Sequence, residues 1–376
     1  MTDSPSADST PARRVDGRLH EQVRIVGSGL LGASIGLGLS ARGVDVIVDD
    51  ASPSTRGLAI AYGAGRAPGP DDAPGLIVVA VPPDVVADVV AAELERYPDA
   101  LVTDVASVKV APLDELRRRG ADLSRYLGTH PMAGRERGGA VSARADLFVG
   151  RPWILAGHDG ISYRRAAALE DLILDLGAVP IEMDAADHDR SVALVSHAPQ
   201  LVASLLASRL RDGSGAALGL AGQGLRDTTR IAASNPALWV QILGANAAEV
   251  AEVLRPLRDD LDRVIAALDD PETSASRRAI ADALATGNDG VSRIPGKHGQ
   301  DKRYTAIVVK VDDKPGELAR LLTEIGEEGV NMEDLRIEHS PETRVGFAEI
   351  SVLPEAAHPL ASALEQRGWT LMEAER

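Results

Sequence analysis

A glycine-rich turn near the start of the chain constrains the fold more than any other feature of the sequence. Gly27, Gly29 and Gly32 follow a β-branched run at Val23–Val26 and open an apolar stretch with helical spacing. In a turn of this G-x-G-x-x-G form, the first glycine permits the tight turn and the second lets the backbone approach a pyrophosphate, while the third allows close helix–strand packing. The phosphates then meet the free N–H groups at the helix start. The motif predicts a dinucleotide site formed by Gly27, Ser28, Gly29, Leu30, Leu31 and Gly32.

An acidic side chain about 20 residues beyond such a turn is expected to hydrogen-bond the ribose hydroxyls of the cofactor. Asp50 is the preferred candidate and Asp49 is its rival, since both stand at the end of the second predicted strand. A carboxylate in this place repels a 2′-phosphate, which favours NAD over NADP. Basic and hydroxyl side chains just downstream keep NADP open as the alternative, namely Ser52, Ser54, Thr55 and Arg56.

The N-terminal half of the chain alternates short β-branched runs with longer helical stretches, which indicates βαβ units and a largely parallel sheet. After Val23–Val26, the predicted strands are Val44–Val48, Leu76–Val81, Ala100–Val105, Leu127–His130, Trp153–Ala156 and Val179–Met183. We therefore expect an α/β domain with a Rossmann-type doubly wound sheet at residues 21–184. Val81 and Pro82 follow the third strand at its carboxyl end, where open sheets hold their ligands, and are further cofactor candidates.

Beyond Asp184 the sequence changes to long Ala/Leu-rich segments, which predict an all-helical domain at residues 185–286. The expected helices are Asp187–Arg211, Leu225–Ala232 and Pro236–Leu268. The first and last are apolar over much of their circumference, and such helices are buried in a core or in an oligomer interface. The pattern alone leaves a monomeric helical core and a dimerisation domain both open.

The two ends of the chain differ in character. Residues 1–20 are polar and rich in Ser, Pro and Asp, which predicts a loose tail. The turn-rich, basic residues 287–303 predict a linker, and residues 304–376 predict a small α+β domain of βαββαβ order. Its expected elements are strands at 304–311, 332–339, 344–352 and 369–372 and helices at 317–328 and 356–367.

Composition excludes several classes of function. With 40 basic and 56 acidic side chains the net charge is −16, which opposes a delocalised attraction to nucleic acid or to an anionic membrane surface. The chain has no cysteine, so disulfides, thiolate nucleophiles and Cys-ligated metal centres are excluded. No run of about 18 strongly apolar residues is evident. We expect a cytoplasmic protein without a metal, whose redox chemistry needs a borrowed cofactor.

Polar segments follow two neighbouring predicted strands, at Thr103–Lys109 and at Gly128–Gly134. Of the eight histidines, His130 in the second segment has the position that suits hydride chemistry. A neutral imidazole beside a nicotinamide can take a hydroxyl proton while hydride leaves the same carbon. A hydrogen-bonded structural histidine is the alternative.

Further candidates lie in the helical region. His197 sits on a long apolar helix, where an imidazole costs free energy unless it is hydrogen-bonded, so it is either a satisfied core histidine or part of a site. Arg226 and Arg230 lie one helical turn apart and are followed by Trp239. Because the guanidinium fork suits a carboxylate, they form either an anion pocket or a solvated helix face.

With these motifs in this order, the chain from Val23 to about Leu268 resembles the prephenate dehydrogenase family, whose members make the tyrosine precursor by oxidative decarboxylation. The motifs that carry the resemblance are the glycine turn, Asp104–Lys109, Gly128–Gly134, Leu194–His197, Arg226–Ala232 and Trp239. The resemblance implies prephenate as substrate, NAD as cofactor, 4-hydroxyphenylpyruvate as product and a homodimer.

The resemblance also implies roles for single residues. His130 would bind the 4-hydroxyl of the substrate and promote hydride transfer, and Ser107 would assist at the same hydroxyl and at the nicotinamide. Arg230 would pair with the ring carboxylate and His197 with the other end of the substrate pocket, while Glu136 would influence substrate choice. Arg226 and Trp239 complete the substrate-binding candidates.

Residues from Tyr304 onward resemble an ACT-type regulatory domain, which implies an amino-acid effector, plausibly tyrosine, at an interface between paired domains. The candidate effector residues are Asp313, Pro315, Gly316 and Asn331. A packing module that binds no ligand is the alternative. The sequence departs from the family at Arg135, where smaller residues are commoner, so prephenate and arogenate both stay open as substrates.

Two rival interpretations are weaker. A phosphoglycerate dehydrogenase-type enzyme also carries an ACT-type domain, but its cofactor domain is inserted mid-chain, whereas Gly27 lies near the start here. A non-catalytic sensor of nucleotides and amino acids would have no need to keep Ser107, His130 and Arg230 together.

Overall fold

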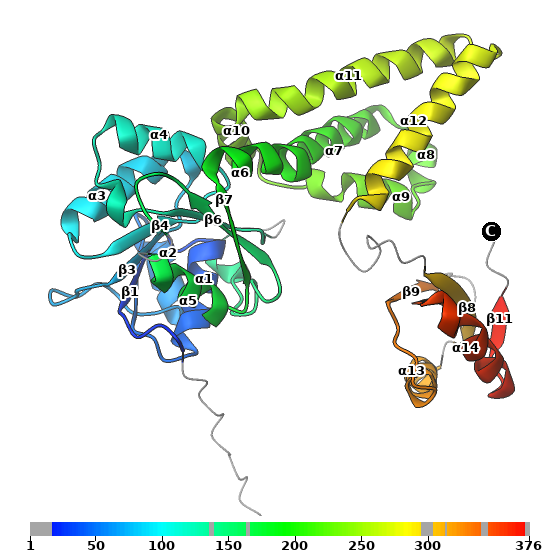
Figure 1. The fold of residues 1–376 in the computed structure, drawn as a ribbon, viewed down its shortest axis with the longest axis horizontal. Helices are drawn as coiled ribbons and strands as arrows, with labels where there is room; N and C mark the ends of the chain where they lie inside the picture. The colour runs from blue at the N-terminus through cyan, green and yellow to red at the C-terminus, as the bar shows by residue number, and fades with distance from the viewer. Residues whose placement is uncertain are drawn as a thin grey trace, which may run out of the picture. The chain divides into compact units, whose positions relative to one another are not determined.

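The computed structural model describes residues 17–134, 139–162, 166–294, 304–312, 314–339 and 345–372. The chain divides into two compact units, residues 1–258 and residues 259–376 (Figure 1). The first unit contains the glycine turn and all the candidate catalytic residues.

The first unit is built on a sheet whose early strands are all parallel. Strands β1 (Val23–Val26), β2 (Val46–Asp49), β3 (Leu76–Val79) and β4 (Leu101–Asp104) lie in the order β2-β1-β3-β4. A parallel bridge between Val102 and Tyr126 continues this sheet toward β5. The predicted strands of this region are therefore present.

The sheet changes direction at its far side. Strand β5 (Gly128–Pro131) pairs with β6 (Pro152–Gly157) in antiparallel fashion, and β6 pairs with β7 (Val179–Asp184) in parallel fashion. The bridge to β4 gives β5 the direction of the first four strands, so β6 and β7 run against them. His130 consequently lies near the same, carboxyl edge of the sheet as the ends of β1, β3 and β4.

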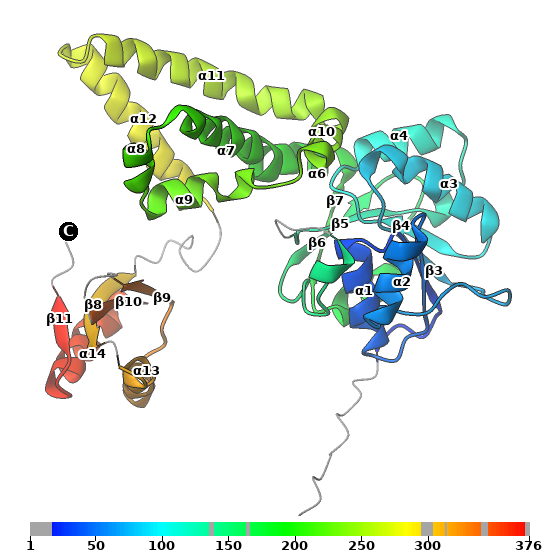
Figure 2. The ribbon, with the colours of Figure 1, turned by 180° about the vertical axis from the view of Figure 1, so that it is seen from behind.

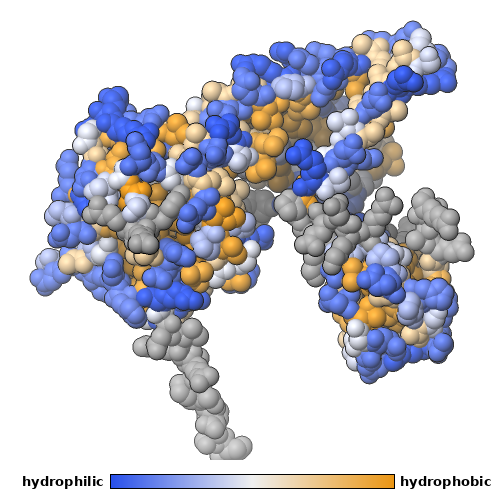
Figure 3. Space-filling model, viewed as in Figure 1, coloured by the Kyte–Doolittle hydropathy of each residue, from blue (hydrophilic) through white to orange (hydrophobic). Residues whose placement is uncertain are grey.

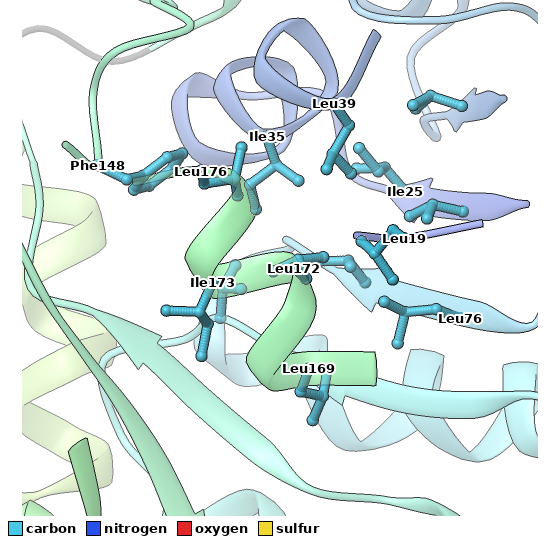
Figure 4. Packing of buried hydrophobic residues seen from close by; sticks show 14 of the residues in the cluster. Leu19, Ile25, Ile35, Leu39, Leu76, Phe148, Leu169, Leu172, Ile173 and Leu176 are labelled. Atoms are coloured by element: carbon cyan, nitrogen blue, oxygen red, sulfur yellow. The ribbon is translucent and has the colours of Figure 1, made fainter. Parts of the chain in front are cut away.

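Helices cover both faces of the first four strands (Figure 2). Helices α1 (Leu30–Ser40), α2 (Pro53–Ala61) and α5 (Ala167–Asp175) contribute to one hydrophobic cluster, and α3 (Val86–Arg96) and α4 (Val110–Arg118) contribute to the other. Alternate residues of one strand enter different clusters: Leu76 and Val78 the first, Ile77 and Val79 the second. Figure 4 shows aliphatic side chains of α1 and α5 meeting those of β1 and β3. The doubly wound fold is confirmed.

The folded part of this unit begins earlier than expected. The backbone N–H groups of Arg18 and Leu19 donate to the carboxylate of Asp175 at 2.8–3.1 Å, and the Leu19 side chain is buried in the first cluster. The expected loose tail is therefore wrong for Arg18 and Leu19, because the Asp175 carboxylate binds both backbone N–H groups and the Leu19 side chain is buried. Residues 1–16 lie outside the described residues.

The helical region of the first unit follows β7 without interruption. Helix α6 (Ala185–Val192) continues through a π-helical turn, η5 (Ala193–His197), into α7 (Ala198–Ser208) and the short η6 (Arg209–Asp212). Next come α8 (Gly215–Gly219), α9 (Gln223–Thr229), η7 (Arg230–Ala232), α10 (Pro236–Ala245) and α11 (Ala247–Asp269), which belongs to this unit as far as Arg258. A π-helical turn often marks a functional position, and this one contains His197.

The single helix expected over Pro236–Leu268 is wrong. The chain bends by 95° between α10 and α11, at Asn246. The Asn246 side chain is buried, and its Nδ2 donates to the backbone oxygen of Asp189 at 2.8 Å and to Nδ1 of His197 at 3.1 Å. These tertiary hydrogen bonds hold the chain in the bend, although the apolar periodicity of the sequence predicted one continuous helix.

Among the described residues, the run Ala185–Asp212 is long and apolar enough to pass for a membrane span, and the bent pair α10–α11 passes when counted together. No such run was evident from the sequence. A core helix passes the same test, however, and this run buries His188, Asp189 and His197, which hydrogen-bond to other parts of the unit.

In the second unit, α12 (Ser274–Ser292) precedes a βαββαβ module. The module consists of β8 (Thr305–Asp312), α13 (Glu317–Glu327), β9 (Asp334–His339), β10 (Val345–Val352), α14 (Pro354–Gln366) and β11 (Thr370–Met372). Its antiparallel sheet has the order β11-β8-β10-β9 over a core of its own, which is the split βαβ arrangement that the sequence predicted. Helix α12 runs past Gly287, where the linker was expected to begin, since a glycine inside a helix costs only about 1 kcal/mol.

Candidate active site

The glycine turn has the geometry of a phosphate-binding loop. Gly27 has a φ of +96°, and a Cβ there would lie 2.4 Å from the backbone oxygen of Ala80. A Cβ on Gly32 would lie 1.9 Å from the oxygen of Gly27, whereas a Cβ on Gly29 would meet nothing within 4 Å. Gly27 and Gly32 are therefore required by the protein itself, while Gly29 borders open space through which a ligand can approach the backbone.

The start of α1 adds donors to this loop. Gly29 is the N-cap residue, no side chain caps the helix, and Leu30 and Leu31 are half-buried. The first N–H groups of a helix have no partner within the helix, and the helix dipole favours an anion beside them. Val81, whose side chain lies against the turn, and the exposed Pro82 follow β3 beside the same turn.

Asp50 and Asp49 differ in what they contact. Asp50 accepts hydrogen bonds from the backbone N–H of Ser28 at 2.7 Å and from its hydroxyl at 2.9 Å. Asp49 forms ion pairs with Arg24 at 2.9 Å and with Arg56 at 3.0 Å. Burial raises the pKa of Asp49, but the hydrogen bonds from Arg24 and, to a smaller extent, from Arg56 outweigh burial and lower it. Asp50 thus belongs to the glycine turn, and Asp49 belongs to the scaffold.

His130 on β5 is held from the helical region. Its Nδ1 lies 2.8 Å from Nε2 of His188, and Nδ1 of His188 lies 2.7 Å from Oδ1 of Asp189, both on α6. Burial lowers the pKa of His130 well below 6.5, and the nearby His188, Lys109 and His197 lower it further. The imidazole of His130 is therefore neutral at neutral pH, as a proton acceptor must be.

A buried ionic network supports β4 and β5 behind His130. Lys109 donates from Nζ to Asp104 and, at 2.7 Å, to the backbone oxygen of Thr129, while the hydroxyl of Tyr126 donates to Asp104 at 2.7 Å. Burial lowers the pKa of Lys109, and Asp104 opposes that shift. Ser107 lies half-buried in the loop between Asp104 and Lys109. The network places this loop next to the strand that carries His130.

His197 is part of the same polar interior. It is buried, its Nδ1 accepts from Asn246 at 3.1 Å, and Trp239 meets it edge to face with the ring centroids 6.0 Å apart. Burial lowers its pKa to about 4. Of the two interpretations from sequence, the structure shows that His197 is hydrogen-bonded; it also places His197 beside the substrate candidate Trp239.

The remaining substrate candidates lie at the surface of the helical region. Arg226 belongs to α9 and Arg230 to η7, both are exposed, and both elements pack against α7. Arg226 donates to the backbone oxygen of Ala221 at 3.5 Å. Glu136, like Arg135, lies outside the described residues.

In the C-terminal module, Gly316 has a φ of +93° and precedes α13, and Pro315 stands just before it. Asn331 donates to Glu333 at 2.9 Å, and Asp313 lies outside the described residues. A cavity of about 270 Å³ near this loop has a polar lining that includes Lys310, Lys314 and Arg320.

Sequence reasoning missed His188, Asp189 and Asn246. All three are buried polar residues, and a buried polar side chain requires a hydrogen-bond partner. That signal was used for His197 alone. Within the described ranges, no group of His, Asp or Glu side chains is arranged to hold a metal ion.

A doubly wound sheet whose carboxyl edge carries both a phosphate-type loop and a half-buried, neutral histidine is typical of a nucleotide-binding oxidoreductase. The family descriptions agree. Residues 35–182 match the prephenate dehydrogenase nucleotide-binding domain, and residues 184–281 match the prephenate dehydrogenase dimerization domain. The chain belongs to the prephenate dehydrogenase family.

Relatives extend this result. The probable prephenate dehydrogenase NovF of Streptomyces niveus is 37% identical over 356 residues, which cover 92% of this chain and 98% of that protein. The crystal structure of Synechocystis arogenate dehydrogenase is similar with a TM-score of 0.59 and 27% identity, over 73% of this chain and all of that one. Aquifex aeolicus prephenate dehydrogenase, solved with hydroxyphenyl propionate and NAD+, has a TM-score of 0.63 and 24% identity over 72% and 99% of the chains, a likeness of fold.

Proposed function

We propose that this protein catalyses the NAD-dependent oxidative decarboxylation of prephenate to 4-hydroxyphenylpyruvate, in tyrosine biosynthesis. The observation that carries the proposal is the neutral, half-buried His130 on the sheet edge where the glycine turn also lies. Membership of the family supports the choice of substrate, and Asp50 at the glycine turn supports NAD over NADP.

In the proposed mechanism, NAD supplies the hydride acceptor when it is bound. His130 accepts the proton of the substrate 4-hydroxyl as hydride leaves the same carbon, and Ser107 orients that hydroxyl. Arg230 binds the ring carboxylate, and His197 and Trp239 border the other end of the substrate. Loss of CO2 then produces an aromatic ring, which makes the overall reaction strongly favourable, so the protein has chiefly to orient the reactants and place charge.

Oxidation of arogenate to tyrosine is the second candidate, and the likeness to the Synechocystis enzyme favours keeping it. The test mixes the purified protein with prephenate or arogenate, each with NAD or NADP, and follows reduced nicotinamide by absorbance. Activity with prephenate and NAD supports the proposal. Activity with arogenate alone would replace the substrate, and silence in all four mixtures would leave a non-catalytic sensor as the better interpretation.

A homodimer formed through the helical region is part of the proposal. Large apolar side chains on these helices are exposed in the single chain, among them Val195, Leu205 and Val240 at 61%, 65% and 70% (Figure 3). Exposed apolar patches commonly mark interfaces. Sedimentation should therefore show a dimer, and the variant V240D should shift it toward monomer; a monomeric parent protein would refute this part.

We propose a nucleotide-binding domain that begins at residue 17 and extends to about 184, and a helical domain from 185 to the end of α12. We further propose that residues 304–376 form a regulatory module and that the protein is cytoplasmic. The βαββαβ order of the module supports an ACT-type domain that binds an amino acid such as tyrosine. Added tyrosine should then lower the rate of the active mixture, and deletion of residues 304–376 should abolish that inhibition.

A further inference from the structure

We propose that His188 and Asp189 form a positioning pair that sets the tautomer of His130, so that Nε2 of His130 is the atom that accepts the substrate proton. This inference rests on the proposed function for its kinetic consequence. Its structural part, the position of the proton on His130, stands without any substrate.

The carboxylate of Asp189 decides which nitrogen of His188 carries a proton. Ionised Asp189 can only accept hydrogen bonds, so Nδ1 of His188, 2.7 Å from Oδ1, carries a proton and donates it. In neutral His188 the other nitrogen, Nε2, then has a free lone pair. Nδ1 of His130 lies 2.8 Å from Nε2 of His188, so Nδ1 must donate the hydrogen bond that this lone pair accepts.

This hydrogen bond also decides the protonation of the other ring nitrogen of His130, Nε2. When Nδ1 of a neutral imidazole carries the proton, Nε2 is an acceptor. His130 is thereby prepared to take a proton through Nε2, and the pair behind it can stabilise the imidazolium that forms. A neutral histidine side chain in water prefers the opposite tautomer, with the proton on Nε2, so removal of His188 should present an N–H where an acceptor is required.

Asp189 is itself held in place. Its Oδ1 accepts from the backbone N–H of Lys109 at 2.8 Å, its Oδ2 accepts from that of Val110 at 2.9 Å, and its backbone oxygen accepts from Asn246 at 2.8 Å. His188 and Asp189 are both buried. The carboxylate thus links the start of α4 to α6, and the orientation of the catalytic histidine depends on contact between the nucleotide-binding and the helical regions.

The direct test is the nitrogen NMR spectrum of the full-length protein labelled with ¹⁵N-histidine, without substrate. The His130 signals are those that vanish in H130Q. We expect a protonated Nδ1 and an unprotonated Nε2 for His130, and H188L should shift the population toward protonated Nε2. An unprotonated Nδ1 in the parent protein would overturn the proposal.

The kinetic test compares three substitutions. H188L removes the acceptor and should lower kcat roughly 100- to 1,000-fold with KM nearly unchanged. H188Q, whose Oε1 can reach the position that Nε2 of His188 occupies, should have a kcat about tenfold higher than that of H188L. The control H158Q alters a histidine that bonds the backbone of Tyr126 and should leave kcat unchanged.

The outcomes separate the two proposals. If the parent protein is active and folded H188L retains its kcat, the positioning pair is wrong and the proposed function stands. If the parent protein is inactive with every substrate, the proposed function fails, while the NMR measurement still decides the tautomer. Should H188L fail to fold, D189N removes the charge at nearly constant volume, and an unchanged kcat in D189N would count against the pair.

Discussion

Nδ1 of His130, on strand β5, lies 2.8 Å from Nε2 of His188, on helix α6. The first residue belongs to the region that matches the nucleotide-binding domain of the family and the second to the region that matches its dimerization domain. The two regions therefore share one hydrogen-bonded site, which explains why α6 carries polar residues in an apolar run.

The substitution H130N should lower kcat by about 100- to 10,000-fold with little change in substrate KM, because proton transfer matters only in the transition state. Steady-state rates at saturating prephenate and NAD measure this. Turnover close to that of the parent protein would remove His130 from the mechanism.

The substitution R230A should instead act on binding. Loss of a carboxylate contact that exists already in the ground state should raise substrate KM about 10- to 100-fold and leave kcat nearly unchanged. R226A is the matched control one helical turn away, and it should have the smaller effect. An unchanged KM in R230A would move the carboxylate site to Arg226, since Lys109 is buried and bound to Asp104.

Two glycines of the turn should respond differently to alanine. G29A meets no neighbouring atom within 4 Å, so it should keep the stability of the protein and raise the KM for NAD. G32A would place its Cβ 1.9 Å from the oxygen of Gly27, and such overpacking should lower the free energy of unfolding by about 1–3 kcal/mol. Thermal unfolding and cofactor titration separate the two effects; equal behaviour of both variants would contradict the loop geometry.

Substitutions of Asp50 and of Asp49 should have different effects. D50N removes the carboxylate beside Ser28 and should raise the KM for NAD about tenfold while improving the use of NADP. D49N removes a partner of the buried Arg24 and should chiefly reduce stability, by about 1–3 kcal/mol. Cofactor preference that changes in D49N and not in D50N would reverse the assignment.

The buried His197 predicts a loss of stability in acid. Its pKa is lowered to about 4 in the folded chain, so the unfolded chain, with a pKa of about 6.5, binds its proton first as the pH falls. The free energy of unfolding should fall by about 2 kcal/mol between about pH 7.5 and about pH 5 through this group alone. The free energy of unfolding is measured with urea at both pH values. In H197Q its change between them should be smaller by that amount, whereas H358N, at an exposed position of α14, should leave the change as in the parent protein.

Much of the fold could be predicted because its signals are local. β-Branched runs matched the strands of the first unit, and the spacing around Pro315 and Gly316 matched the turn before α13. The ordering of Arg18 and Leu19 was missed because it depends on Asp175, far along the chain. The break between α10 and α11 was missed because Asn246 is held by Asp189 and His197 rather than by its neighbours.

For the site, the sequence by itself determined the glycine turn, the acidic residue that follows it and the candidate histidine at a strand end, because each depends on backbone geometry within a few residues. Only the tertiary structure decided that the side chain of Asp50, rather than that of Asp49, contacts the turn and that His188 and Asp189 hold His130. A hydrogen bond between residues 58 positions apart leaves no periodic trace in a single sequence, since it depends on how the sheet and helix α6 pack.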